Sequence, residues 1–287
     1  MTVGGKDERD VGRERNNRRL VGIVLIPFCL ISFTRFVDGK TTLIPPKITA
    51  DSYILMDAES GGVYYGRNIR RPMIPASTLK ILTALLVLGG GRLERTVLIP
   101  AEAEGIEGSS MYLKAGERLT RFELLNGLLL VSANDAAVAL AISDTGSVRS
   151  FVDEMNAFAR RMHWNGTRCV DPSGLSDANR SDALDLACMT RVALRNPVFK
   201  RIVSAQSFRI PSRPPAKVLL CNHNKFLRRY PGADGVKTGY TIAAGHTLVA
   251  SAKRGRRHWI VVLMHSRDPY GDAQRLMDFG FLHWPKR

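Results

Sequence analysis

The chain has 287 residues with a hydrophobic fraction of 45%, which suits one large globular domain or two closely packed lobes around an ample core. Its net charge of +16 is unusual, and because residues 1–46 contain 8 basic and 5 acidic residues, the remaining 34 basic and 21 acidic residues leave +13 on the folded part. No basic block with interleaved aromatic residues is present, so we exclude a nucleic-acid groove. We favour a solvated basic surface over an anionic polymer or lipid environment as the reason for the excess.

The N-terminal segments have the layout of an export signal. Residues 1–19 are polar and arginine-rich, and we expect them to be disordered, whereas residues 20–34 form an uncharged apolar run. The run is short for a membrane span of about 20 residues, but no Ala-x-Ala cleavage site follows it. We therefore predict an uncleaved signal-anchor, with a cleaved signal as the alternative. In either case residues 35–49 are a linker, and the folded domain spans 50–287 outside the cytoplasm.

The first elements of the domain are a predicted β-hairpin and a central helix. Tyr53–Asp57 and Val63–Tyr65 flank a glycine-rich turn. Pro75 suits a first helical turn, and the apolar run after Lys80 predicts a buried helix. Ser77 and Lys80 have the i, i+3 spacing that puts two side chains on one face. Burial would favour the neutral amine of Lys80, which could then take the proton of Ser77.

A second polar cluster lies between two predicted helices, Phe122–Val131 and Ala136–Ile142. Ser132 and Asn134 fall on the short connection, where polar side chains can face a cleft. Asp135 is predicted to cap the second helix. The alternative is that Ser132 and Asn134 are simple linker and capping residues.

The remaining elements predict a sheet built from both ends of the domain. Helices are expected at Phe151–Met162, Ala183–Leu194 and Asp272–Leu282, and strands at Gly235–Tyr240, His246–Ala252 and His258–His265, with a basic turn at 253–257. Strands at both ends with helices between them predict an α+β fold with one antiparallel sheet.

The third polar cluster is Lys237-Thr238-Gly239 on the first of these strands. Lys237 and Gly239 should point to one side of the strand and Thr238 to the other. Gly239 would let a ligand or another backbone approach closely.

The cysteine pattern gives no metal site. Cys29 lies in the apolar run, and Cys169, Cys188 and Cys221 allow one disulfide whose pairing the sequence does not choose. No Cys or His spacing typical of zinc occurs, so we expect no metal and no cofactor.

Together the three clusters form a specific set. Ser77-x-x-Lys80, Ser132-x-Asn134 and Lys237-Thr238-Gly239 occur in the order found in β-lactamases and penicillin-binding proteins. From about Ser52 to Phe281 the chain resembles the serine D-alanyl-D-alanine carboxypeptidases of peptidase family S11, the low-molecular-mass penicillin-binding proteins. The resemblance also covers Pro75-Ala76-Ser77, Leu128–Ala137, Asp171-Pro172-Ser173-Gly174-Leu175, Gly235–Thr241 and Leu276–Phe281.

The resemblance implies an α+β fold in which the antiparallel sheet carries helices on both faces beside an all-helical lobe. It also implies that Ser77 attacks the carbonyl between two D-alanines to form an acyl-enzyme, that Lys80 takes its proton, and that Ser132 relays a proton to the leaving amine. Peptidoglycan stem peptides ending in D-Ala-D-Ala would be the substrates, and β-lactam antibiotics would react as their analogues.

The same resemblance assigns the binding groups. Asn134 would hold the substrate amide and brace the lysine, while Lys237 and Thr238 would bind the terminal carboxylate beside Gly239. The backbone N–H groups of Ser77 and Tyr240 would form the oxyanion hole.

The sequence motifs leave three other functions open. A D,D-endopeptidase that cuts peptidoglycan cross-links would use the same clusters. A class A β-lactamase needs a deacylating glutamate, and between Asn134 and Lys237 the one glutamate is Glu154, inside an amphipathic helix. A non-enzymatic wall-binding protein would not need all catalytic positions intact.

Overall fold

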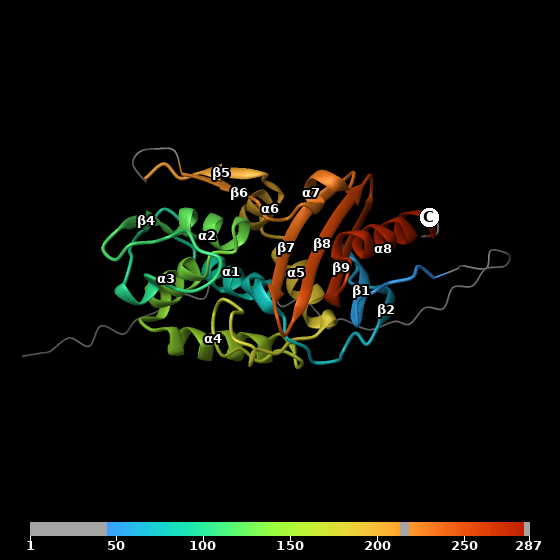
Figure 1. The fold of residues 1–287 in the computed structure, drawn as a ribbon, viewed down its shortest axis with the longest axis horizontal. Helices are drawn as coiled ribbons and strands as arrows, with labels where there is room; N and C mark the ends of the chain where they lie inside the picture. The colour runs from blue at the N-terminus through green and yellow to red at the C-terminus, as the bar shows by residue number, and fades with distance from the viewer. Residues whose placement is uncertain (1–44, 213–217, 284–287) are drawn as a thin grey trace, which may run out of the picture.

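A five-stranded antiparallel sheet joins the two ends of the described chain. The computed structural model describes residues 45–212 and 218–283. The strand order is β2-β1-β9-β8-β7, so the N-terminal hairpin pairs with a C-terminal strand, as the sequence predicts (Figure 1). The strands are β1 (Ser52–Asp57), β2 (Val63–Arg67), β7 (Ala233–Thr241), β8 (Gly245–Arg254) and β9 (Arg257–Ser266).

Both faces of the sheet are buried. In β1, Ile54 and Met56 belong to the core shared with the helical lobe, while Tyr53 and Leu55 belong to a second core under the C-terminal helix. Side chains alternate between the two faces of a strand, so a run without polar positions fits a strand covered on both sides. The helices α5 (Ala183–Ala193) and α8 (Pro269–His283) supply the two covers.

The helical lobe lies on the β7 side of the sheet (Figure 1). Its α2 begins with a capping box, in which Thr120 and Glu123 satisfy each other's backbone N–H groups. The helices other than α5 and α8 are η1 (Ala76–Leu79), α1 (Lys80–Gly89), η2 (Ala101–Ala103), α2 (Arg121–Leu130), α3 (Asn134–Thr145), α4 (Val148–Arg161), α6 (Pro197–Ser204) and α7 (Phe226–Arg229).

Two small ribbons complete the described fold. They pair β3 (Thr96–Leu98) with β4 (Arg118–Thr120), and β5 (Ser207–Arg209) with β6 (Leu219–Cys221). No sequence pattern predicted these ribbons, because three-residue strands are too short to show an alternating pattern.

Two local predictions need correction. Asp135 does not cap α3, since the N-cap is Ala133 without a side-chain hydrogen bond. The Asp135 carboxylate accepts a hydrogen bond from the first-turn N–H of Ala136 at 2.8 Å, and it also holds a distant loop by accepting from the backbone N–H groups of Met111 and Leu113 at 3.0 Å. The central helix also starts later than predicted, because Ser77 lies in a 3₁₀ turn and α1 begins at Lys80.

Several predictions about the chain ends lie outside the described residues. These are the tail at 1–19, the apolar segment at 20–34 and most of the linker at 35–49. Across residues 45–212 and 218–283, no helix combines the length and apolarity needed to cross a bilayer. In the same part of the chain, no disulfide joins Cys169, Cys188 and Cys221.

Candidate active site

Ser77 and Lys80 meet at the junction of η1 and α1. A 3₁₀ turn has three residues per turn, so side chains at i and i+3 eclipse each other. Lys80 Nζ accordingly lies 2.9 Å from Ser77 Oγ. The preceding residue, Ala76, has a φ of 46°, which is unfavourable for a residue with a Cβ. Such strain is typical of functional turns, and here it sets the direction of the chain just before the serine.

The Lys80 amine is completely buried and has three oxygen neighbours. It donates to Asn134 Oδ1 at 2.7 Å and to the Ser173 carbonyl at 2.6 Å. Burial lowers the pKa of Lys80 well below its ordinary value, and the nearby charge of Lys237 lowers it further. A neutral amine has two N–H groups and one lone pair. With its two protons given to Asn134 and Ser173, the lone pair faces Ser77 Oγ and can accept the hydroxyl proton.

Asn134 is the first residue of α3 and is held at both ends. Its backbone N–H donates to the Ser109 carbonyl at 2.8 Å, and its Nδ2 donates to the Glu107 carbonyl at 2.7 Å. One N–H of the carboxamide therefore remains for a substrate. Ser132 lies two residues earlier, 5% exposed, with a φ of 64° that turns the chain between α2 and α3.

Strand β7 brings the third cluster against the nucleophile. An added Cβ on Gly239 would lie 2.9 Å from the Ser77 backbone nitrogen and 2.4 Å from Thr247 Oγ1, so only glycine permits this approach. Thr247, on the neighbouring strand β8, donates to the Pro75 carbonyl at 3.1 Å and ties the sheet to the same turn. Tyr240 follows Gly239 and is exposed.

Lys237 is the second buried lysine of the site. It is 1% exposed, and its Nζ donates to the Thr238 carbonyl at 2.8 Å. Burial lowers the pKa of Lys237 to about 7. The half-buried Thr238 is next to it, so a bound carboxylate would restore the missing charge partner of the ammonium group.

The loop that follows α4 supplies groups that the motif spacing does not reveal. The Asp171 carboxylate accepts hydrogen bonds from Ser173, Ser176 and Asn179. Burial raises the pKa of Asp171, but these hydrogen bonds outweigh that effect and the net shift is downward. The loop so fixed presents the Ser173 carbonyl to Lys80. The Asp171–Leu175 segment was part of the family resemblance seen in the sequence, but its contact with Lys80 was not predicted.

His223 is a further residue near the site that the sequence analysis missed. Its backbone N–H donates to the Leu130 carbonyl at 2.9 Å, close to the Ser132 connection. The His223 side chain is exposed at the surface, but partial desolvation lowers its pKa, and the charge of Lys237 lowers it further. The imidazole is therefore close enough to Lys237 to respond to the charge in the carboxylate-binding region.

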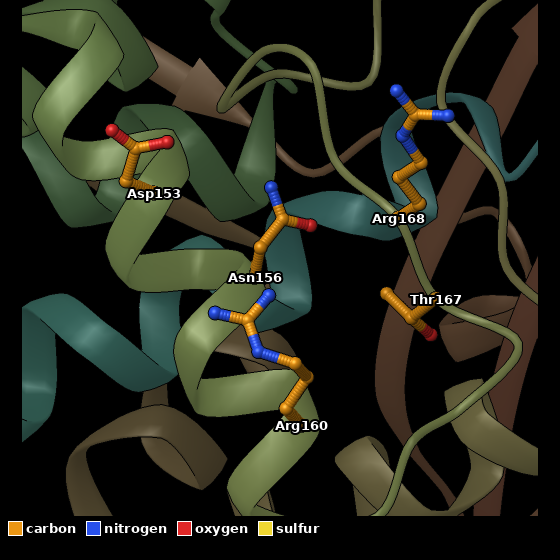
Figure 2. A pocket seen from close by; sticks show the side chains of 5 residues that line it. All are labelled: Asp153, Asn156, Arg160, Thr167 and Arg168. Carbon is orange, nitrogen blue, oxygen red and sulfur yellow. The ribbon is translucent and has the colours of Figure 1, made fainter.

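A separate polar hollow lies between α4 and the loop that follows it, not at Ser77. Figure 2 shows three side chains from one face of α4 opposite two from the following loop. Asn156 is already engaged with the backbone of Cys169 through both ends of its carboxamide. No group of His, Cys, Asp and Glu within the described ranges could hold a metal ion. The residues lining the hollow are Asp153, Asn156, Arg160, Thr167 and Arg168.

Comparisons with known proteins give a consistent match. The family model described as D-alanyl-D-alanine carboxypeptidase matches residues 39–268. The D-alanyl-D-alanine carboxypeptidase DacB2 of Mycobacterium tuberculosis is 38% identical over 247 residues, covering 82% of this chain and 84% of the relative.

Solved structures agree in fold. A D-alanyl-D-alanine carboxypeptidase from M. tuberculosis H37Rv has a TM-score of 0.81 at 36% identity, over 88% of this chain and 98% of that one. Penicillin binding protein 6B of Escherichia coli has a TM-score of 0.77 at 31% identity, over 83% and 79% of the two chains. These matches confirm the α+β, penicillin-binding-protein-like fold predicted from the sequence.

Proposed function

The chain belongs to the D-alanyl-D-alanine carboxypeptidase family, and we propose that it removes the terminal D-alanine from peptidoglycan stem peptides through an acyl-enzyme on Ser77. The observation that carries this proposal is the buried Lys80 amine. It donates hydrogen bonds to Asn134 and Ser173, and its lone pair faces Ser77 Oγ. This arrangement supports a serine hydrolase of cell-wall metabolism that needs no metal for activation of its nucleophile.

The first chemical step is acylation. Lys80 takes the Ser77 proton as Oγ attacks the penultimate D-alanine carbonyl. The backbone N–H groups of Ser77 and Tyr240 stabilise the oxyanion. The close approach of Gly239 to the Ser77 nitrogen supports this assignment, because it brings β7 to the nucleophile's amide.

Substrate orientation comes from both sides of the site. Lys237 and Thr238 bind the terminal carboxylate, and the remaining N–H of the Asn134 carboxamide holds the peptide amide. Ser132 passes a proton to the leaving D-alanine amine. Water then attacks the acyl-enzyme and releases the shortened peptide.

Penicillin reacts with the same serine. Its strained amide and carboxylate have the spacing of D-Ala-D-Ala, so it acylates Ser77, and its tethered leaving group obstructs water. Glu154, the candidate for a deacylating base, is exposed on α4, which speaks against rapid β-lactamase turnover. Intact-mass measurement should find one stable adduct, and peptide mapping should place it on Ser77.

Muropeptide mass spectrometry tests the reaction itself. Purified protein should shorten stem peptides by one D-alanine, and Ser77→Ala should not. Cleavage of cross-links without loss of terminal D-alanine would identify the endopeptidase instead. Binding of stem peptides without cleavage would contradict both enzymatic functions.

The location of the enzyme is a second part of the proposal. The apolar residues 20–34 hold the domain at the outer face of the cytoplasmic membrane, because a basic segment precedes them and no small-residue cleavage motif follows. N-terminal sequencing of the membrane fraction should find the intact segment. A soluble protein starting near residue 40 would show a cleaved signal.

A further inference from the structure

The end of the sheet opposite Ser77 carries a concentrated positive charge. Strand β7 runs from this end at Ala233 to Gly239 beside Ser77, a span of about 20 Å in an extended strand. We call the cations there the basic end; they come from α7 with its preceding residue, from the adjoining ends of β8 and β9, and from the turn between these strands. The basic end consists of Lys225, Arg228, Arg229, Lys253, Arg254, Arg256 and Arg257.

Hydrogen bonds join Lys253 and Arg254 to the residues that directly follow α7. Lys253 N–H donates to the Gly232 carbonyl at 2.8 Å, and Arg254 Nε donates to the Pro231 carbonyl at 3.1 Å. The Arg254 guanidinium also lies 4.6 Å from the centre of the Tyr230 ring. The segments are 24 positions apart in sequence, so the fold creates this cluster.

The charge of the basic end is largely uncompensated. Neither 225–229 nor 253–257 contains an acidic residue. Among the described residues, the carboxylate partner recorded for these cations is Asp278, 4.0 Å from Arg254. Arg257 is half-buried, and the other six side chains are exposed. Like charges gathered in this way repel one another, so the cluster is suited to an anionic partner rather than to solubility alone.

The C-terminal turn of α8 lies beside the basic end and carries an exposed apolar residue. Arg257 donates to the Phe281 carbonyl near the end of α8 at 2.8 Å, and the next residue, Leu282, is 76% exposed. Cations beside an exposed leucine are the combination found on surfaces that lie at a lipid interface.

The chain enters the domain at the other end of the sheet, where Thr49 lies beside Ser266 at the C-terminal end of β9. Thr49 bonds to the Asp272 carboxylate in the first turn of α8, and Ile48 packs against the core under α8 and α7. Figure 1 shows the described N-terminal residues and the C-terminal end of α8 on the side of the sheet away from the helical lobe. The described chain therefore begins in the layer of α8, but at the N-terminal end of that helix, whereas the basic end lies at its C-terminal end.

We propose that the basic end docks on the anionic phospholipid headgroups of a membrane. Phosphate groups pair with the exposed lysine and arginine side chains, and Leu282 enters the interface. The β7 strand then holds Ser77 about 20 Å or more from the headgroups. The surface is separate from the catalytic residues and acts whether residues 20–34 remain attached or are removed.

The test uses the full chain on two kinds of vesicle, phosphatidylcholine alone and phosphatidylcholine mixed with phosphatidylglycerol. Acetylation of Lys225 and Lys253 is followed by mass spectrometry, with Lys114 of the helical lobe as an internal control. We expect at least fivefold slower acetylation of Lys225 and Lys253 on the anionic vesicles, reversed by high salt, and no change at Lys114. Because residues 20–34 are present on both vesicles, their insertion alone cannot produce the difference.

A matched pair of variants identifies the surface. Arg228→Glu with Arg256→Glu should remove most of the protection, whereas Arg118→Glu with Arg149→Glu, equally exposed in the helical lobe, should retain it. Both should hydrolyse a soluble peptide at the wild-type rate, which excludes misfolding. Equal acetylation on the two vesicles, or equal loss in both variants, would overturn the proposal. Equal protection by soluble polyphosphate would overturn it in favour of an anionic wall polymer.

Discussion

The two ends of β7 use the same kinds of side chain in opposite environments. At the catalytic end, Lys80 and Lys237 are 0% and 1% exposed, and burial lowers the pKa of both. At the basic end the cations are mostly exposed to water. A lysine removed from water can act as a base, or its ammonium group can be stabilised by binding a carboxylate. A solvated lysine contributes charge alone. Burial, rather than residue type, therefore separates chemistry from docking in this molecule.

Among substitutions that test this comparison, replacement of the buried Lys80 should have the largest effect on activity. Lys80→Ala removes the base and leaves Ser77 with its proton, so kcat should fall by roughly 10³-fold or more. Penicillin acylation should slow to a similar degree, as measured by intact mass against time. Lys253→Ala at the basic end is the control and should acylate at the wild-type rate. A Lys80→Ala enzyme within tenfold of wild type would rule out this base.

The second effect concerns recognition of the chain end. Lys237→Gln should lower kcat/KM by about 100-fold because a buried charge-assisted hydrogen bond to the carboxylate is lost. Amidating the peptide's C-terminus should cost the wild-type enzyme a similar factor. The variant should discriminate little between acid and amide. If wild-type enzyme cleaves the amide as well as the acid, Lys237 does not have this role.

A third effect is on stability and has the opposite sign. Burial of Lys237 without a carboxylate is unfavourable, so Lys237→Met should raise the free energy of unfolding by roughly 2 kcal/mol at pH 6. The folded-state pKa of Lys237, about 7, lies below its ordinary value, so the unfolded state binds more protons above pH 7 and wild-type stability rises with pH. The advantage of the variant should therefore shrink from pH 7 toward pH 10.

Denaturant titrations at pH 6 and pH 9 measure that difference. Lys253→Met, at an exposed position of the basic end, should change stability by no more than about 0.5 kcal/mol at either pH. A destabilised Lys237→Met protein would mean that the buried ammonium has a compensating partner in the folded state.

The smallest expected effect is the decrease of kcat/KM at alkaline pH. Carboxylate binding needs the protonated form of Lys237, so kcat/KM should fall about tenfold per pH unit above pH 7. A separate acidic limb should appear where Lys80 becomes protonated and stops acting as a base. Lys237→Arg should lose the alkaline limb because arginine stays charged. An unchanged alkaline limb in that variant would assign it to another group.

Local patterns were sufficient for much of the fold. The run at 53–56 predicted a strand, and the apolar segments before and after Ser132 predicted two helices, because burial periodicity is local in sequence. The same locality explains the failures. Asp135 looked like a cap by its position, but its carboxylate bonds to Met111 and Leu113, which no short-range pattern relates to it.

The sequence by itself determined the family, the chemistry-bearing residue types and their order, since Ser77-x-x-Lys80, Ser132-x-Asn134 and Lys237-Thr238-Gly239 can be recognised without a structure. Tertiary structure alone decided how they act. It brought the Ser173 carbonyl to the Lys80 amine, pressed Gly239 against the Ser77 nitrogen, and joined two short basic segments into one surface. These contacts connect residues far apart in the chain, so they depend on how whole elements pack, whereas a motif depends on its neighbours in sequence.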